Sequence, residues 1–184
     1  AASTPMDAAA HDLWRFSLRV YRAPGVERAC LALQDGQGAD VNLLLFCGWL
    51  AGRGFALDGR RLRQAMARTR AWQSAVIVPL RAVRRAHKRL AAAAGQTQAA
   101  ASALHKRLLA LELELEHLEQ TALFDLAASW PPPRRPVSPP QAAQANLTRY
   151  LELLCGTAGA ASAAPAAAHV QTLRAAFEAA WTGG

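Results

Sequence analysis

The stretch GVERACLALQDGQGADVNLLLFCGWL, residues Gly25 to Leu50, decides the fold of this 184-residue chain. Its first part places apolar residues at i, i+3, i+4 and i+7, which is typical of a short helix with one buried face and predicts a helix over Val26–Gln34. The next four residues, Asp35-Gly-Gln-Gly38, combine a short polar side chain with two glycines and predict a turn.

The second part of the stretch predicts the central helix of the domain. Asp40 stands where its carboxylate can accept a hydrogen bond from a free amide of the following first turn, so we expect it to be an N-cap. Val41–Ala51 is apolar on nearly all sides, which is typical of a helix buried all round. Gly52 to Gly54 should end it, and Asp58 is expected to cap the next helix.

Working outward, we expect a helix over Asp7–Arg22 on the N-terminal side and a long helical hairpin on the C-terminal side. The hairpin arms are Gly59–Ala94 and Thr97–Ser129, joined at Gly95-Gln-Thr97. Each arm carries apolar residues stepping by 4 and 3, which predicts a coiled-coil-like seam between antiparallel helices. The seam residues are Trp72, Val76, Pro79, Val83, Ala86 and Leu90 on one arm and Leu104, Leu108, Leu111, Leu115, Leu118 and Ala122 on the other. Pro79 should kink or break its arm.

The fold class predicted is therefore all-α, a bundle of about seven helices that includes the hairpin. We expect one domain over residues 1–184, made of an N-terminal cluster (7–58), the hairpin (59–129), a proline-rich linker (130–140) and C-terminal helices (141–184). The linker contains PPPRRPVSPP, which favours an extended chain.

The chain is basic, with a formal net charge of +8 and a pI near 10.6. Such a charge suggests an acidic partner such as nucleic acid. However, nearly all the basic residues are arginine, in a background of alanine, glycine and proline, and GC-rich coding produces this composition without any binding role. Nucleic-acid binding therefore stays open as an alternative.

A basic stripe on the first hairpin arm is the main candidate binding surface. It contains Arg81, Arg84, Arg85, Lys88 and Arg89. The opposite arm carries Glu112, Glu116 and Glu119, so we expect intramolecular pairing across the seam in preference to contact with an anionic partner.

Asp40 and Asn42 are the remaining candidate site residues. A buried amide needs hydrogen-bonding partners, so Asn42 is expected to fix the fold, with a ligand role as the alternative. The loop around Asp40 has too few oxygen ligands for calcium and no lysine for phosphate. The three cysteines show no CxxC spacing, and no metal-binding or nucleophile motif is present. We therefore predict no metal, no cofactor and no catalytic residue, and favour a protein that is not an enzyme.

The runs from Phe16 to Ala51 and from Trp72 to Leu90 resemble a family of small uncharacterised bacterial proteins. The shared features are a PGV start, a CLxLQD turn, a DVNLLL helix and a W…PLRxxR segment. The resemblance covers roughly the first two-thirds of the chain and implies no activity, because the family has none established.

The leading functional expectation is a non-enzymatic cytoplasmic protein-binding or adaptor module that uses the hairpin as its contact surface. The alternatives are a nucleic-acid or ribosome-associated factor and a small-ligand or enzyme site in the helical cluster. The sequence also predicts no membrane insertion, since its longest apolar run is too short to span a bilayer, and it allows an oligomer formed through the hairpin seam.

Overall fold

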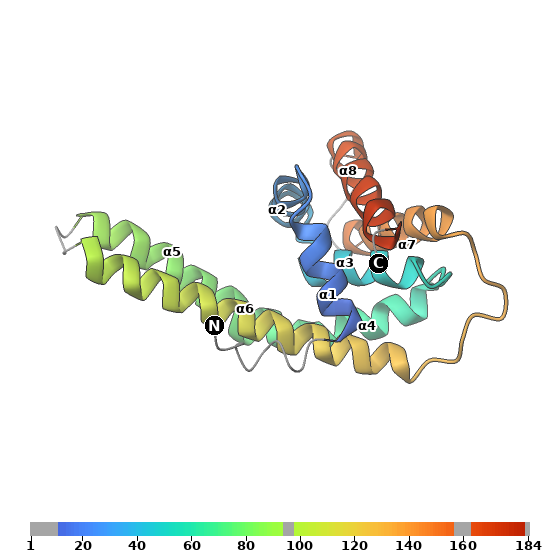
Figure 1. Cartoon of the computed structure of the whole chain (residues 1–184), viewed down its shortest axis with the longest axis horizontal. Helices are drawn as coiled ribbons and strands as arrows, with labels where there is room; N and C mark the ends of the chain where they lie inside the picture. The colour runs from blue at the N-terminus through green and yellow to red at the C-terminus, as the bar shows by residue number, and fades with distance from the viewer. Residues whose placement is uncertain (1–10, 94–97, 157–162, 183–184) are drawn as a thin grey trace.

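The structure is a computed structural model that describes residues 11–93, 98–156 and 163–182. These residues form helices and no strand, as predicted. The helices are α1 (Asp12–Tyr21), α2 (Val26–Gln37), α3 (Val41–Ala51), α4 (Gly59–Trp72), the π-helical turn η1 (Gln73–Ile77), α5 (Val78–Ala93), α6 (Gln98–Ala128), α7 (Pro139–Cys155) and α8 (Ala163–Thr182). Because α4, η1 and α5 follow one another without a break, they make one long helix, and the described residues contain seven separate helical rods (Figure 1).

Helix α3 is the centre of the cluster, which confirms the prediction from its sequence. Every residue from Asn42 to Ala51 is buried, and the helix contacts α1, α2, α6, α7 and α8. Asp40 caps it as expected, since its Oδ1 accepts a hydrogen bond from the Asn42 amide at 2.9 Å. Gly48 lets α8 approach closely, because a Cβ at this position would lie only 2.6 Å from the Phe177 ring.

Two predicted boundaries in this region are wrong. Helix α2 continues to Gln37, so Asp35 and Gly36 are helical and do not form a turn. The reversal occurs at Gly38, whose φ of 68° is left-handed and whose amide bonds to the Gln34 and Leu33 carbonyl groups. Helix α1 begins after His11, whose side chain accepts from the Trp14 amide; residues 7–10 of the predicted helix lie outside the described residues.

The hairpin extends away from the cluster as a two-helix arm (Figure 1). Asp58 caps its first helix by accepting from the Arg61 amide. Pro79 does not break this helix. Instead, the wider turn η1 comes immediately before it, and such a turn removes the clash between a proline ring and the carbonyl group four residues earlier. The predicted reversal at residues 95–97 lies outside the described residues.

The residues between the hairpin arms differ from the predicted seam. Val83, Leu90, Leu104, Leu111 and Leu118 are all exposed. The sheltered positions on α6 follow a stripe turned toward one side, and they are Ala101, His105, Leu108, Glu112, Leu115 and Glu119. A seven-residue apolar pattern gives the face of a helix but does not say which part of that face meets its neighbour. The glutamates expected to pair with the basic stripe include Glu112 and Glu119, which lie in this sheltered stripe, so their contacts are made inside the seam between the two arms.

The C-terminal helices complete the cluster. The proline-rich segment is non-helical, as predicted, and α7 starts at Pro139, slightly earlier than expected. Helix α7 packs on α3, and α8 packs on α2. Buried Asn146 attaches α7 to the end of α3, since its amide group donates to the Cys47 and Phe55 carbonyl groups and accepts from the Leu57 amide.

Candidate functional site

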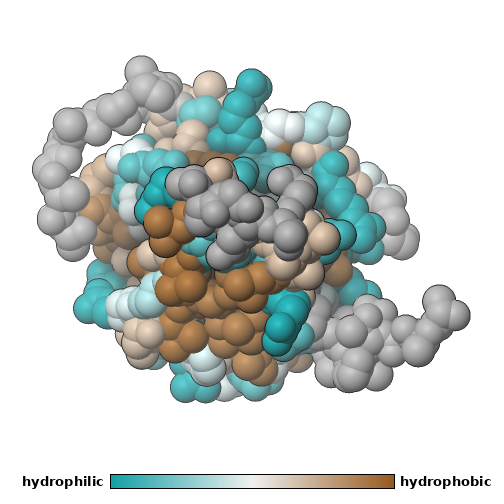
Figure 2. All heavy atoms as spheres, turned by 90° about the vertical axis from the view of Figure 1, so that its left-hand side faces the viewer, coloured by the Kyte–Doolittle hydropathy of each residue, from teal (hydrophilic) through white to brown (hydrophobic). Residues whose placement is uncertain are grey.

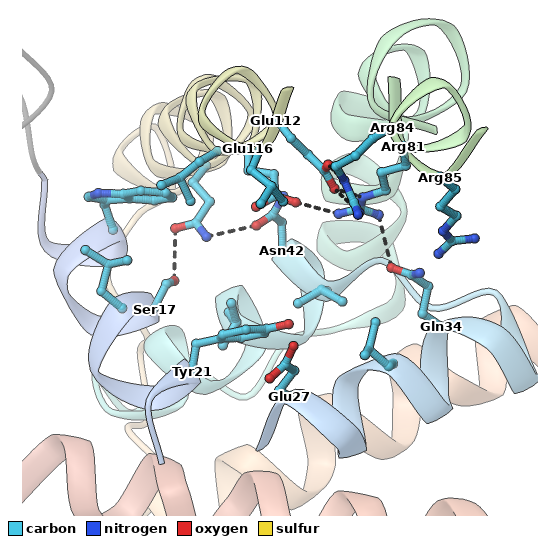
Figure 3. A pocket seen from close by; sticks show the side chains of 18 residues that line it. Ser17, Tyr21, Glu27, Gln34, Asn42, Arg81, Arg84, Arg85, Glu112 and Glu116 are labelled. Atoms are coloured by element: carbon cyan, nitrogen blue, oxygen red, sulfur yellow. Dashed lines mark hydrogen bonds and ion pairs between the residues drawn. The ribbon is translucent and has the colours of Figure 1, made fainter. Parts of the chain in front are cut away.

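A groove of about 610 Å³ lies between α1 and α2 on one side and the hairpin on the other (Figure 3). Its walls are mainly apolar, and they include Leu18, Leu31, Val41, Leu45, Leu109 and Leu113. Four large lining side chains remain exposed to between 37% and 42%, and they are Tyr21, Leu31, Leu109 and Leu113. The groove therefore exposes apolar side chains of α1 and α2 on one wall and of α6 on the other.

Arg81 closes one side of this groove and is held by three other side chains. Its Nε donates to Glu112 Oε1 at 2.9 Å, its Nη2 to Glu116 Oε1 at 2.5 Å and its Nη1 to Gln34 Oε1 at 3.0 Å. Burial acts to lower the pKa of Arg81, but the charges of Glu116 and Glu112 outweigh burial and raise it. The guanidinium group thus joins both hairpin arms to α2.

The rest of the predicted basic stripe divides into paired and exposed residues. Arg84 donates to Glu112 Oε2 at 2.6 Å, so the expected pairing across the hairpin is found for Arg81 and Arg84. Arg85 lines the groove and is exposed, and Lys88 is exposed farther along α5. Glu119, which was also expected to pair with this stripe, instead contacts the cluster.

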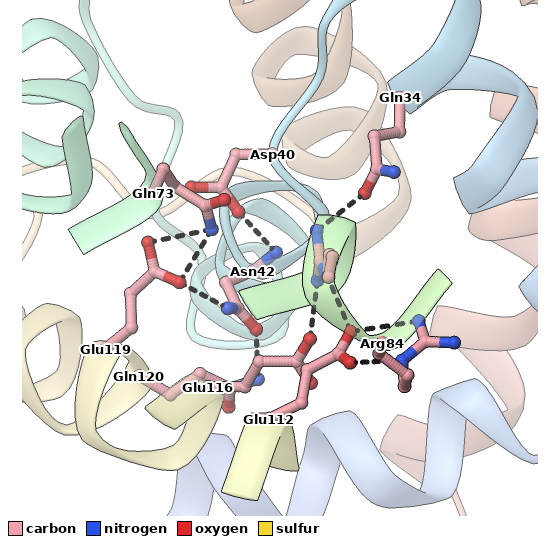
Figure 4. A network of polar contacts seen from close by, with 10 residues as sticks. Gln34, Asp40, Asn42, Gln73, Arg84, Glu112, Glu116, Glu119 and Gln120 are labelled. Atoms are coloured by element: carbon pink, nitrogen blue, oxygen red, sulfur yellow. Dashed lines mark hydrogen bonds and ion pairs between the residues drawn. The ribbon is translucent and has the colours of Figure 1, made fainter. Parts of the chain in front are cut away.

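Asn42 links α3 to the hairpin beneath the groove (Figure 4). Its Nδ2 donates to Glu119 Oε2 at 2.6 Å, and its Oδ1 accepts from Gln120 Nε2 at 2.9 Å. Gln120 in turn accepts from the Ser17 hydroxyl at 2.9 Å. The buried amide therefore has the partners that it needs, and both are side chains of α6.

Asp40 and Glu119 form a carboxyl pair behind Asn42. The charge of Asp40 acts on Glu119, and Gln73 Nε2 donates to both Glu119 carboxyl oxygens, at 3.1 Å and 2.8 Å. Burial first, and then the neighbouring Asp40 charge, raise the pKa of Glu119 to about 9; burial also raises the pKa of Asp40. Two buried carboxyl groups in contact cannot both be ionised, so the pair holds a shared proton at neutral pH.

A second cavity, of about 510 Å³, lies on the other side of Arg81. It is lined by Asp40, Gln73, Arg85 and Tyr150 among other residues. The Tyr150 hydroxyl accepts from the Asp40 amide at 2.8 Å, and burial raises its pKa. Asp40, Asn42, Arg81 and Arg85 are thus brought around one polar region, whereas Lys88 is not part of it.

Within the described residues, no group of three histidine, cysteine or acidic side chains is placed to hold a metal ion. Cys30 and Cys47 are buried free thiols, and burial raises the pKa of Cys30 to about 12 and that of Cys47 further. Neither is therefore an activated nucleophile. Among the helices described, none has the length and apolar character needed to cross a bilayer.

Sequence reasoning missed several polar residues of this region. Gln34, Gln73 and Gln120 complete the contacts of Arg81, Glu119 and Asn42. Glutamine is common on exposed helix surfaces, so a single sequence gives no signal that separates these three from solvated side chains. A polar residue recurring in the α6 stripe, as Glu112 and Glu119 do, is the one pattern that could have indicated a polar seam.

Residues 12–123 match the model of a family described as a protein of unknown function, DUF2390, and the chain belongs to this family. The predicted resemblance to a family of uncharacterised proteins is thereby confirmed. The match runs from the start of α1 into α6 and contains every groove residue named above, whereas α7 and α8 lie outside it. No curated protein and no solved structure matches the chain.

Proposed function

We propose that this member of the DUF2390 family is a non-enzymatic protein-binding module whose groove receives the apolar side of a partner's amphipathic helix. One observation carries the proposal: Tyr21, Leu31, Leu109 and Leu113 are exposed together along the walls of the groove. Apolar side chains gathered on a concave surface are typical of sites where another protein docks.

The charges of the groove support an apolar occupant. Arg81 and Arg84 are already neutralised by Glu112 and Glu116, so an incoming anion would have to displace these ion pairs. An apolar side chain needs no such exchange and gains about 25 cal/mol for each Å² of apolar surface it buries. The size of the groove is also within the range of ordinary binding clefts, about 300–1,000 Å³.

The alternatives receive less support from the same contacts. A nucleic-acid-binding surface would need free cations, and with Arg81 and Arg84 paired the predicted stripe keeps Arg85, Lys88 and Arg89 for this role. A small ligand could use the same groove, and the experiment below separates it from a protein. We also propose a cytoplasmic location, which is supported by the free thiols of Cys30, Cys47 and Cys155.

Affinity capture from the native host, with two matched variants on one helix, tests this function. Leu109 faces the groove, and Leu111 does not line it, although their exposed fractions are similar, 42% and 46%. We expect Leu109→Glu to lose the captured partner and Leu111→Glu to retain it. Cross-linking followed by mass spectrometry should then map Leu109 to a partner segment with apolar residues at i, i+3 or i+4, and i+7.

Three outcomes would contradict the proposal. Capture of no protein that depends on Leu109 would remove the protein-binding function. Loss of a bound small molecule from the Leu109→Glu variant, with no protein involved, would favour the ligand alternative. Capture of RNA that is lost in Arg85→Glu/Lys88→Glu and weakens steeply with salt would favour the nucleic-acid alternative.

A further inference from the structure

A second apolar surface lies on the hairpin, outside the groove. It consists of Val83 and Leu90 on α5 and of Leu104, Leu111 and Leu118 on α6, and we call it the leucine face. These five apolar side chains remain between 42% and 68% exposed, and they line neither of the cavities described above. Figure 2 views the hairpin from its tip and shows apolar residues, in brown, gathered on the exposed surface.

Helix geometry places the leucine face on one side of the hairpin. A residue turns about 100° around an α-helix, so positions seven apart fall within about 20° of each other. Leu104, Leu111 and Leu118 therefore follow one line on α6. Leu109 and Leu113, which line the groove, lie about 140–180° away from Leu104 by the same count. The leucine face is thus turned away from the groove, and a partner on one surface leaves the other free.

The apolar pattern of α6 is that of a helix with two neighbours. Leu108 and Leu115 are half-buried in the hairpin, while Leu104, Leu111 and Leu118 alternate with them and stay exposed. In a four-helix bundle each helix buries such a stripe partly against its own hairpin partner and partly against the opposite pair. Within the hairpin alone, the second half of the stripe has no partner.

The charges beside the leucine face are self-complementary. Arg107 lies four residues before Leu111 and Glu114 lies three residues after it, both exposed on the edge of this face. Neither forms an ion pair with another described residue. A two-fold axis at Leu111 would bring Leu104 opposite Leu118 of a second copy and would bring Arg107 beside its Glu114, one residue from the directly opposite position. An interface between identical subunits requires this kind of match of a surface with itself.

We propose that two copies of this chain associate through their leucine faces, with the hairpins antiparallel around a two-fold axis at Leu111, to form a four-helix bundle. The outer face of α5 suits this packing, because its side chains there are small or apolar: Pro79, Ala82, Val83, Ala86 and Leu90. The interface goes beyond the proposed protein-binding function, since it uses the opposite side of α6.

Light scattering coupled to size-exclusion chromatography tests the dimer with the full chain. We expect wild type at about 50 µM to elute at twice the 19.6-kDa chain mass. Leu111→Glu should be monomeric, since it places two carboxylates at the axis, whereas the matched Leu109→Glu should stay dimeric. A monomeric wild type, or an equal response of the two variants, would overturn the proposal. Circular dichroism of each variant checks that a lower measured mass reflects dissociation of the dimer and not unfolding of the chain.

Two further variants test the register of the interface. A cysteine at the axis must meet its own copy, so Leu111→Cys should form a disulfide-linked dimer on mild oxidation and Leu109→Cys should not, both in a Cys155→Ser background. Arg107→Glu and Glu114→Arg should each raise the dimer dissociation constant about tenfold, and the double exchange should restore it. Cross-linking at Leu109 but not at Leu111, or no rescue in the double exchange, would refute the proposed register.

Discussion

Replacing Glu119 with glutamine should remove a loss of stability that wild type suffers as the pH rises. In the folded protein the pKa of Glu119 is raised to about 9 from an ordinary value of 4.5. Between these two values the folded state holds a proton that the unfolded chain releases, so the free energy of unfolding falls as pH increases. One such proton corresponds to about 1.4 kcal/mol per pH unit. From pH 7 to pH 8.5, wild type should therefore lose about 2 kcal/mol.

Over this interval the glutamine variant should lose about 2 kcal/mol less than wild type. Its amide oxygen can still accept from Asn42 Nδ2, which lies 2.6 Å from Glu119 Oε2 in wild type, while the amide nitrogen at the other position no longer accepts from Gln73. A difference of 2 kcal/mol corresponds to about 4–8 °C in melting temperature for a chain of this length. Urea denaturation followed by circular dichroism at pH 7.0, 7.5, 8.0 and 8.5 measures the slope directly.

The control is Glu114→Gln, which changes an exposed carboxylate on the same helix and should keep the wild-type slope. The interval from pH 7 to 8.5 lies above the ordinary histidine pKa but reaches that of cysteine, so the buried Cys30 and Cys47, which ionise on unfolding, add a loss of about 0.4 kcal/mol each. This loss is the same in wild type and in both variants, so the difference between them reports Glu119. A wild-type stability that does not change over the interval would refute the shared proton. A Glu119→Gln variant that retains the full slope would show that another group titrates.

Four other substitutions test the packing and the caps. Gly48→Ala should destabilise the protein by about 1–3 kcal/mol in urea denaturation, because its Cβ would lie 2.6 Å from the Phe177 ring. At Gly36, which is also helical, an added Cβ meets nothing within 4 Å, so Gly36→Ala should stabilise the protein by about 0.5–1 kcal/mol. Changes of the same sign would contradict this reasoning. Asn146→Ala should cost about 3 kcal/mol or more by the same assay, since it removes three buried hydrogen bonds and leaves the Leu57 amide without its side-chain acceptor. A cost under 1 kcal/mol would mean that water replaces the side chain. Burial, and then the charge of a neighbouring histidine, lower the pKa of His11, so that below pH 6.5 the folded state holds fewer protons than the unfolded chain and its stability falls with acidification. His11→Asn can still cap α1 and should show a smaller fall in melting temperature between pH 7 and pH 5. An unchanged acid response would argue against the His11 cap.

Local signals in the sequence were enough to predict the centre of the fold. The N-cap at Asp40 and the buried helix that follows it depend on neighbouring residues only, and both are found. The pairing of Arg81 with Glu112 was also predictable, because the two lie on adjacent arms of one hairpin. The contact of Asp40 with Glu119 was not, since it joins the cluster to the hairpin across 79 positions of sequence and depends on how the two are docked.

The π-helical turn at Gln73–Ile77 also determines how the sequence can change its length. Such a turn accommodates one residue more than a regular α-helix does. Deleting a single residue from it would therefore restore a regular α-helix and leave α5 in nearly its present rotation relative to α4. A single deletion within α4 would instead rotate the helix beyond it by about 100°. Arg81 would then turn away from Glu112 and Gln34. We therefore expect related chains to lose a residue between Asp58 and Arg81 only within this turn.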